Sequence, residues 1–352
     1  MRLVSLSEVL PGDPVTNQEL ADRFGAQEQW LDRMTGNRSR YFCRPDGPVG
    51  VPKSTGDLAT AAGELALAAG AIDPGSLEFV ILATASPDHL VPATVTLVAE
   101  RLGLVGIPTF QLMSGCSGAL QGLYTAQALL RSGLRRGLVI GADTCLSLWP
   151  TGKTDRRLTP ADLLGWPLSG DGGGAAVVDA DDTRPGLVVR HLFVRTTAKG
   201  RPPGQVVRWY GPDGAPYVTA PDGSTGLEPM GEQSLGAIER YVPGAAQEVL
   251  DELLTVTGWP LSSVENVLTP QLNGILSERI RGYLGVRREQ SVPCVADTGD
   301  SGNALSLIQL HRAQQRVGSG IGYGGRLLVT AVEPAKWIVA GMALTHQAGL
   351  PR

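Results

Sequence analysis

Residues 116–143 read CSGALQGLYTAQALLRSGLRRGLVIGAD, and residues 300–333 read DSGNALSLIQLHRAQQRVGSGIGYGGRLLVTAVE. Each stretch continues from Ser-Gly into the apolar periodicity of a helix, reaches a glycine suited to a helix C-terminus, and ends in a short apolar run. Such runs are typical of strands that are buried on both faces of a sheet. Strand-like segments at 78–84 and 265–270 precede the two helices. The repeat therefore predicts a duplicated α/β fold, in which each half reads strand–helix–strand–helix–strand.

The repeat also predicts which residues meet. We place one half at 1–180 and the other at 181–352, so that Cys116 and Asp300 occupy equivalent positions at the N-termini of two central helices. Packing about a pseudo-twofold axis would bring these two residues together. A thiol at a helix N-terminus is expected to have a lowered pKa, and neighbouring backbone amides can hold a tetrahedral oxyanion. Cys116 is therefore the predicted nucleophile, with a buried structural cysteine as the alternative interpretation.

The composition excludes several classes of protein. Charged residues make up 18% of the 352-residue chain and apolar residues 42%, which favours a compact globule over a disordered chain. A net charge of −4 gives no basic field for nucleic acid, and no apolar run is long enough to span a membrane. The four cysteines lack metal-binding spacing, and residues 1–14 lack a signal-peptide core. We expect a cytoplasmic protein with free thiols, no metal and no cofactor.

Six segments resemble those of a known family in their order and spacing. They are WLDRMTGNRSR at 30–40, LATASPDHLVPAT at 82–94, MSGCSGA at 113–119, GDGGGAAVV at 170–178, NVLTPQLN at 266–273 and GDSGNA at 299–304. With these segments the chain resembles β-ketoacyl-ACP synthase III over nearly its whole length. The resemblance implies a thiolase fold of the α/β class with a five-layer αβαβα architecture, and a homodimer. It also implies that Cys116 accepts an acyl group from a thioester.

The family's other two catalytic residues are replaced in this chain. The histidine motif of the family aligns with residues 269–273, which puts Pro270 at the position of the imidazole, or Gln271 after a shift of one residue. Asn273 stands at the end of the same motif. The family's asparagine corresponds to Asp300. The resemblance thus places Gln271, Asn273 and Asp300 among the candidate catalytic residues.

A further departure concerns charge near the expected oxyanion site. The family's Gly-rich segment becomes residues 332–337 here and contains Glu333. An ionised Asp300 accepts hydrogen bonds and donates none. At about 4 Å and an effective dielectric near 20, it would repel a thioester oxyanion by roughly 4 kcal/mol, or about three powers of ten in rate. A carboxylate can instead take a proton from an attacking acceptor, so we expect Asp300, aided by Glu333, to act as a base. A helix N-cap is the alternative role of Asp300.

Three further residues are candidates for substrate binding. Trp30 matches the family's adenine-stacking tryptophan, but Met34 and Leu163 stand where the family has CoA-binding arginines. This weakened site favours an acyl carrier protein over acyl-CoA as the donor. Val91 lies in a segment that the resemblance places near the dimer interface, and we assign it to the substrate site. Arg279 belongs to a basic cluster that can dock an acidic carrier, with a solvated helix face as the alternative.

The sequence favours an acyltransferase of polyketide or other specialised metabolism. It would move an acyl group from a carrier-protein or CoA thioester, through acyl-Cys116, to a hydroxyl, amine or thiol of a small-molecule or carrier-bound acceptor, without decarboxylation. One alternative is a decarboxylative 3-oxoacyl-ACP synthase III whose missing groups lie elsewhere in the sequence. Another is a non-catalytic subunit of a heterodimeric ketosynthase. The intact cysteine argues against this last alternative.

Overall fold

The computed structural model describes residues 1–24, 27–145, 168–197, 200–208, 217–219, 225–227, 231–316 and 322–350. Within these residues a nine-stranded sheet has the order β13-β14-β15-β8-β1-β7-β6-β4-β5. At its centre β1 joins β8 through two residue pairs, Arg2↔Val188 and Leu3↔Leu187. The short joint divides the strands into two smaller sheets, one in each half of the chain.

The N-terminal half forms the first of these sheets. Its elements are β1 (Arg2–Val9), α3 (Thr55–Ala69), β4 (Phe79–Thr84), α4 (Thr94–Arg101), β5 (Thr109–Met113), α5 (Gly118–Arg131), β6 (Arg136–Asp143) and β7 (Gly172–Asp179). In the order β5-β4-β6-β7-β1, strand β4 lies between two parallel neighbours. Every residue of β4 is buried, because helices cover both faces of the sheet.

The C-terminal half repeats this plan. Its elements are β8 (Gly186–Thr196), α7 (Leu235–Thr257), β13 (Asn266–Leu268), α8 (Gly274–Tyr283), α9 (Val295–Thr298), α10 (Leu305–Gln315), β14 (Arg326–Glu333) and β15 (Ile338–Gln347). The order β13-β14-β15-β8 matches β4-β6-β7-β1. An isolated parallel bridge between Val267 and Ser291 lies where β5 pairs with β4 in the first half. We place the boundary between the halves at 180/181, between β7 and β8.

The remaining elements are short and lie outside the two main sheets. They are β2 (Val15–Thr16), α1 (Asn17–Phe24), α2 (Glu28–Thr35), β3 (Ser39–Arg40), β9 (Gln205–Val207), β10 (Tyr217–Thr219), β11 (Thr225–Leu227) and β12 (Gly231–Gln233), with 3-10 turns at Pro74–Ser76, Leu261–Ser263, Arg288–Gln290 and Gly302–Ala304. A small apolar cluster formed by Val15, Leu20, Ala21, Leu31 and Phe42 packs α1 and α2 together.

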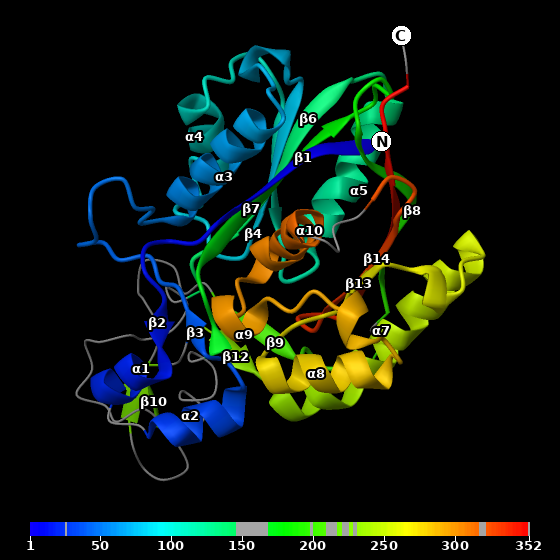
Figure 1. Cartoon of the computed structure of the whole chain (residues 1–352). Helices are drawn as coiled ribbons and strands as arrows, with labels where there is room; N and C mark the ends of the chain where they lie inside the picture. Colours follow the sequence, from blue (N-terminus) through cyan, green and yellow to red (C-terminus); the bar gives the residue numbers. More distant parts are fainter. Residues whose placement is uncertain are drawn as a thin grey trace.

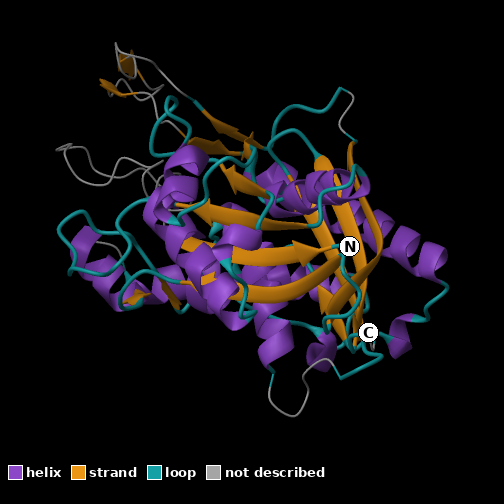
Figure 2. Ribbon diagram, turned by 90° about the horizontal axis from the view of Figure 1, so that it is seen from above, coloured by secondary structure: helices purple, strands orange, loops and turns teal. Residues whose placement is uncertain are grey.

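Three large apolar clusters separate the layers of the molecule. The central cluster contains side chains of α5 and α10, such as Leu120 and Leu310. A second cluster packs α3 and α4 on the N-terminal sheet, and a third packs α7 and α8 on the C-terminal sheet. Figure 1 shows α5 and α10 between these outer pairs of helices, and Figure 2 shows helices on both sides of the strands. The order of layers is helix–sheet–helix–sheet–helix, as the resemblance implies.

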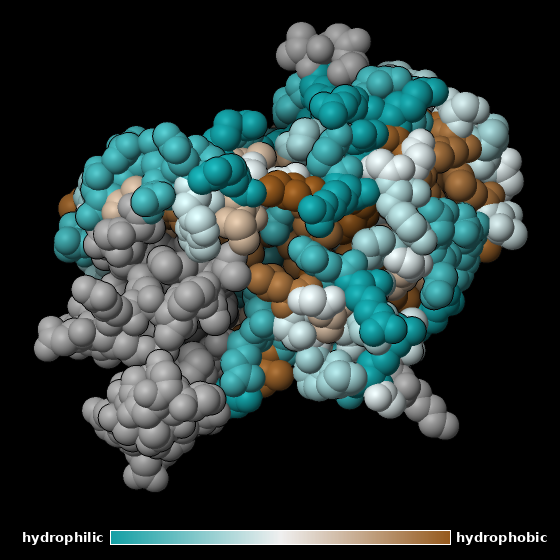
Figure 3. Space-filling model, turned by 90° about the horizontal axis from the view of Figure 1, so that it is seen from below, coloured by the Kyte–Doolittle hydropathy of each residue, from teal (hydrophilic) through white to brown (hydrophobic). Residues whose placement is uncertain are grey.

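The surface is mixed in character. Figure 3 shows a face on which hydrophilic residues predominate and hydrophobic residues are exposed in the central part. Among the exposed large apolar side chains are Val91 and Val105, each 89% exposed, and Met113, 59% exposed. No helix in the described part of the chain is long and apolar enough to cross a membrane.

Candidate active site

Cys116 lies in the turn that leads from β5 into α5. Strand β5 ends at Met113, and α5 begins at Gly118 with Ser117 at its N-cap. The Gly118 amide donates to the Gly115 carbonyl at 2.9 Å, which closes the chain tightly around the cysteine. The Cys116 side chain itself is half-buried. The expected position of the thiol, just before a helix that follows a strand, is confirmed.

Asp300 occupies the matching position in the other half. Its amide donates to the Leu168 carbonyl at 2.8 Å, and its carbonyl accepts from the Gly170 amide at 2.9 Å. Its Oδ1 accepts from the Gly302 amide at 3.1 Å, so the carboxylate partly caps the 3-10 turn that follows. Helix α10 begins only after this turn, at Leu305. The helix therefore starts later than the sequence pattern predicts.

Asn303 holds the two segments together. Its Nδ2 donates to the Ser114 carbonyl at 2.7 Å and to Asp143 Oδ2 at 2.8 Å. A side chain at Gly118 has no room, because its Cβ would lie 1.9 Å from Asn303 Oδ1. The charge of Asp300 is close enough to raise the pKa of the Cys116 thiol. The segments that carry positions 116 and 300 therefore lie side by side, joined by Asn303 and Ser114.

Two buried carboxylates each belong to one half of the chain and accept hydrogen bonds from the other half. Asp143 ends β6, is 1% exposed, and accepts through Oδ2 from the Asn303 amide at 2.8 Å, at the entrance to α10. Glu333 ends β14, is 4% exposed, and accepts through Oε2 from the Ser117 hydroxyl at 2.5 Å, at the entrance to α5. Each carboxylate thus supports the helix start of the other half. Sequence reasoning missed Asp143, although the repeat itself carried the signal, because its two strands end in Asp and Glu.

Asp143 has a structural role that its hydrogen bonds explain. Its Oδ1 accepts from the Thr84 hydroxyl at 2.9 Å, the Ala85 amide at 2.7 Å and the Ser86 hydroxyl at 3.0 Å. Burial raises the pKa of Asp143, and the bonds from Asn303, Ala85 and Thr84 oppose that rise. The side chain ties the ends of β4 and β6 to the start of α10.

The electrostatics of Cys116 correct one sequence expectation. Burial raises the pKa of its thiol well above the usual value, and the charges of Asp300, Glu333 and Asp143 raise it further. This direction is opposite to the lowering expected at a helix N-terminus, and its causes are burial and the nearby carboxylates. Burial also raises the pKa of Asp300 to about 7, aided by Asp143 and opposed by the Gly302 amide. A neutral thiol beside a carboxyl group that titrates near neutral pH is suited to proton transfer.

A small cavity of about 20 Å³ lies against Cys116. Its lining includes Pro270 and Gln271, the residues that stand at the expected position of the imidazole, together with Ser306 and Thr330. None of the described residues that line it is a histidine. The side chains that face the thiol at this cavity are therefore apolar or neutral polar groups.

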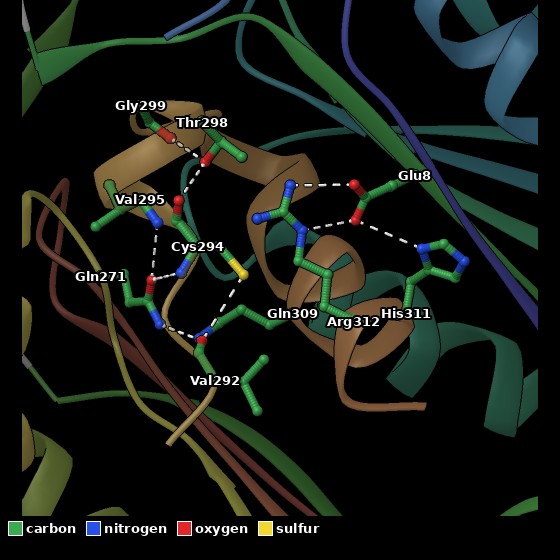
Figure 4. A network of polar contacts seen from close by, with 10 residues as sticks. All are labelled: Glu8, Gln271, Val292, Cys294, Val295, Thr298, Gly299, Gln309, His311 and Arg312. Carbon is green, nitrogen blue, oxygen red and sulfur yellow. Dashed lines mark hydrogen bonds and ion pairs between the residues drawn. The ribbon is translucent and has the colours of Figure 1, made fainter. Parts of the chain in front are cut away.

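Gln271 is held by backbone on the far side of the cavity. Its Oε1 accepts from the Cys294 amide at 2.8 Å and the Val295 amide at 3.0 Å, and its Nε2 donates to the Val292 carbonyl at 2.7 Å (Figure 4). These bonds hold the Gln271 amide against the backbone of residues 292–295. Asn273 is the N-cap of α8, where its side chain accepts from the Leu276 amide at 2.8 Å. A catalytic role for either residue stays a prediction.

The same network reaches the N-terminal half through α10. Arg312 donates from Nε to Glu8 Oε2 at 2.9 Å and from Nη2 to Glu8 Oε1 at 3.1 Å, and His311 Nδ1 lies 3.4 Å from Glu8 Oε2 (Figure 4). Glu8 belongs to β1, so these contacts fasten α10 to the opposite half. His311 is thereby engaged with Glu8 rather than with the Cys116 cavity, whose described lining does not include it.

The candidate substrate-binding residues lie on three separate elements. Trp30 packs from α2 against the apolar cluster of α1 and α2. Val91 is 89% exposed, and Arg279 is exposed on α8. In the basic cluster, Arg281 and Arg288 both contact Glu278, whose charge offsets theirs. The CoA-related position Leu163 lies outside the described residues.

The other three cysteines are free thiols. Cys294 is fully buried, and burial raises its pKa to about 12. Burial also raises the pKa of Cys43 and of Cys145. The charges of Asp143 and Asp300 raise the pKa of Cys145 further, and this thiol follows closely on Asp143 at the end of β6. The described residues contain no group of three or more His, Cys, Asp or Glu side chains that could hold a metal ion.

Comparison with known sequences adds independent findings. The family model of 3-oxoacyl-[acyl-carrier-protein] synthase III matches residues 110–195. The chain is 31% identical to β-ketoacyl-[acyl-carrier-protein] synthase III 3 of Streptomyces coelicolor over 94% of this chain and 92% of that protein. It is 29% identical to β-ketoacyl-[acyl-carrier-protein] synthase III of Neisseria meningitidis serogroup B over 90% of this chain and 93% of that protein.

Solved structures agree with these sequence relationships. AbyA1, described as a tetronic acid condensing enzyme, superposes with a TM-score of 0.87 at 37% identity and covers 98% of this chain and 99% of its own. The 3-oxoacyl-(acyl carrier protein) synthase III of Pseudomonas aeruginosa PAO1 superposes with a TM-score of 0.78 at 24% identity, over 99% of each chain. This second likeness concerns the fold alone.

Proposed function

The chain belongs to the β-ketoacyl-ACP synthase III family, and from this premise we propose that it passes an acyl group from a thioester, through acyl-Cys116, to a hydroxyl, amine or thiol acceptor without decarboxylation. The family resemblance and the thiolase fold expected from the sequence are confirmed. The proposal rests on one observation, the gathering of carboxylates around the Cys116 turn. Glu333 accepts from the Ser117 hydroxyl at 2.5 Å, and Asn303 joins Asp143 to the Ser114 carbonyl. The charges of Asp300, Glu333 and Asp143 raise the pKa of the Cys116 thiol. Carboxylates accept protons, whereas decarboxylative condensation needs hydrogen-bond donors for a developing oxyanion.

In the first half-reaction, the Cys116 sulfur attacks the carbonyl carbon of the donor thioester. The thiol proton passes to the carboxylate of Asp300, a C–S bond forms to Cys116, and the C–S bond of the donor breaks. Asp300 then returns the proton to the departing thiolate. Its pKa, raised to about 7 by burial, suits a group that must both accept and release a proton at neutral pH.

In the second half-reaction, the acceptor attacks the acyl carbon of the thioester on Cys116. The acceptor proton passes to Asp300 as the new bond forms, and the Cys116–carbon bond breaks. The released Cys116 thiolate takes the proton from Asp300, which restores the resting enzyme. Glu333 supports this cycle by accepting from Ser117, the residue next to the nucleophile.

The likeness to AbyA1 favours oxygen as the attacking atom. A tetronic acid ring is a lactone that also contains ring carbon–carbon bonds, so its assembly includes acylation of a hydroxyl oxygen beside the condensation that the name of this relative states. At 37% identity over nearly the whole of both chains, this relative supports a hydroxyl acceptor more than an amine or a thiol. We therefore propose a hydroxyl-bearing acyl thioester or small alcohol as the acceptor.

One experiment separates the proposal from its two alternatives. The protein is incubated with acyl-carrier-protein and acyl-CoA thioesters, and the mass of the peptide that contains Cys116 is measured. Acylation of this peptide is expected, and its absence would favour the non-catalytic subunit. A hydroxyl acceptor is then added in one arm and malonyl-carrier protein in another. Ester formation without CO₂ supports the proposal, whereas CO₂ release from malonyl-carrier protein supports the decarboxylative condensing enzyme.

The donor and the quaternary structure complete the proposal. Synthases III of this family use carrier-protein and CoA thioesters, and we propose a carrier protein as the donor because Met34 replaces a CoA-binding arginine. We also propose a homodimer. Strand β5 is the last strand at its end of the sheet, and its residues are partly exposed, so an edge is available for a second copy. Light scattering at micromolar concentration is expected to give twice the chain mass of 36.9 kDa.

A further inference from the structure

A second cavity, open to solvent along much of its rim, lies at the end of the C-terminal sheet that is remote from Cys116. Its volume is about 410 Å³, and its lining includes Arg190, His191, Trp259, Arg326 and Thr345. Arg326 begins the 8-residue strand β14 and Glu333 ends it, so at about 3.3 Å per residue the cavity lies roughly 23 Å from the thiol site. This volume is in the range of small-molecule binding sites. We call it the C-terminal cavity.

The N-terminal half has a counterpart at the start of β6, with a volume of about 580 Å³. The two places correspond in detail. The Arg136 guanidinium donates to the Ser76 hydroxyl at 2.9 Å, and the Arg326 guanidinium donates to the Ser263 hydroxyl at 2.7 Å. Each serine ends a 3-10 turn that precedes the neighbouring strand. The counterpart therefore provides an internal reference for the C-terminal cavity.

The charges at the equivalent positions differ. In the N-terminal half, Asp179 pairs with Arg136 across the strands and forms an ion pair with it at 2.6 Å. In the C-terminal half, Thr345 stands opposite Arg326 in the same register. The described residues that line the C-terminal cavity include no carboxylate. The charge of Arg136 is thus offset by a carboxylate in the N-terminal half, whereas no described lining residue offsets the charge of Arg326 in the C-terminal half.

A β-bulge adds a second arginine to the C-terminal cavity. Strand β8 carries one extra residue, Arg190, in its pairing with β15. Strand β1 has the equivalent bulge in its pairing with β7, but the extra residue there is Val4. Arg190 donates from Nε to the Thr345 hydroxyl at 2.7 Å, which positions its guanidinium beside that threonine. Two guanidinium groups thus line the C-terminal cavity without a lining carboxylate among the described residues.

We propose that the C-terminal cavity binds a small organic phosphate dianion between Arg190 and Arg326. Each guanidinium presents paired N–H groups that match the oxygens of a phosphate. Both side chains are already held by a hydroxyl, which lowers the entropy cost of binding. The Trp259 ring lies under the Arg326 guanidinium, 5.2 Å from centroid to carbon, and supplies an aromatic wall for the organic part of the ligand. This inference is independent of the proposed acyl transfer.

Calorimetric titration with phenyl phosphate tests the proposal, with inorganic phosphate in a parallel arm to measure the contribution of the ring. Wild-type protein is expected to bind phenyl phosphate more tightly than inorganic phosphate. Thr345→Asp copies the N-terminal arrangement, in which Asp179 neutralises Arg136, and is expected to weaken binding at least tenfold. Thr345→Asn is the matched neutral control and should stay within about threefold of wild type. Arg326→Gln should again lose at least tenfold.

Two results would overturn the proposal. One is equal affinity of Thr345→Asp and Thr345→Asn for phenyl phosphate, and the other is the absence of binding by wild-type protein at millimolar ligand. Arg195→Gln serves as a surface control, because Arg195 already pairs with Glu252 outside the C-terminal cavity. Acylation of Cys116 should be unchanged in Thr345→Asp and Thr345→Asn, which verifies that both variants are folded.

Discussion

The two halves of the molecule share one strand order and one arrangement of helices, but matching positions carry different chemistry. The N-terminal half presents Cys116 before its central helix, and the C-terminal half presents Asp300. The strands that end beside them carry Asp143 and Glu333, each bonded to the opposite helix start. Symmetry of the backbone therefore brings two segments together, and in the proposed function their side chains act as a nucleophile and a base.

The largest expected effect comes from removing the nucleophile. Cys116→Ala should abolish acyl-enzyme formation and lower turnover by about three powers of ten or more, because the proposed mechanism carries the acyl chain on the Cys116 sulfur. Cys145→Ala is the matched control, since the charges of Asp143 and Asp300 raise the pKa of this second thiol as well. Intact-protein mass spectrometry after incubation with an acyl thioester measures both variants. An acyl adduct on Cys116→Ala would refute the assignment.

Converting the proposed base, Asp300, to an amide tests whether it takes the proton in acyl transfer. Asp300→Asn should slow acyl transfer by about 10²- to 10⁴-fold, the usual contribution of a positioned base. Wild-type transfer should rise with pH and level off above about 7, where Asp300 is ionised, and the variant should lose this rise. Transfer rates measured from pH 5 to 9 provide the profile. A gain of CO₂ release from malonyl-carrier protein in wild type at low pH would instead favour the condensing alternative.

Asp300→Asn should slow acyl transfer but raise the free energy of unfolding. The folded-state pKa of Asp300 is raised from 3.8 to about 7, so the folded protein binds an extra proton between these values and loses stability as pH rises through them. Asp300→Asn removes this loss. The variant should match wild type near pH 3 and gain up to about 4 kcal/mol in unfolding free energy by pH 8. Urea unfolding at several pH values measures the difference, and a pH-independent difference would contradict the raised pKa.

The crossing carboxylates should differ in what they contribute to stability. Asp143→Ala leaves several buried donors without a partner and should cost about 3 kcal/mol of unfolding free energy. Glu333→Ala affects chiefly the Ser117 hydroxyl and should cost about 1 kcal/mol. Chemical denaturation of both variants gives the comparison. Equal costs would show that the two halves use their carboxylates in the same way.

Much of the fold could be predicted because its helices and strands depend on the local pattern of apolar residues. The apolar periodicity of 116–143 and 300–333 predicts the central helices and the strands after them, and α5, β6, α10 and β14 lie there. The start of α10 could not be placed, because the turn at Gly302–Ala304 depends on packing against Asp143. Pattern shows which segments are buried. It does not show which backbone groups a buried side chain will bind.

The residues of the candidate site could likewise be predicted only in part. Cys116 and Asp300 could be named from motif order, since both follow from short segments with a defined place in the repeat. The structural uses of Gln271 and Asn273 could not, because they depend on segments distant in the sequence or on the exact start of a helix. The resemblance placed these two residues by alignment, and alignment carries no information on which bonds their amides already make.

The amino-acid sequence by itself determined the duplication, the order of elements and the place of Cys116 between a strand and a helix, because these depend on neighbours along the chain. Only the tertiary structure decided that the pKa of Cys116 is raised and that Asp143 and Glu333 each bind the opposite half of the chain. It also decided that Arg190 and Arg326 line one cavity. The reason is physical: desolvation and charge–charge interaction depend on distance through space, and the fold brings together residues that lie far apart in sequence.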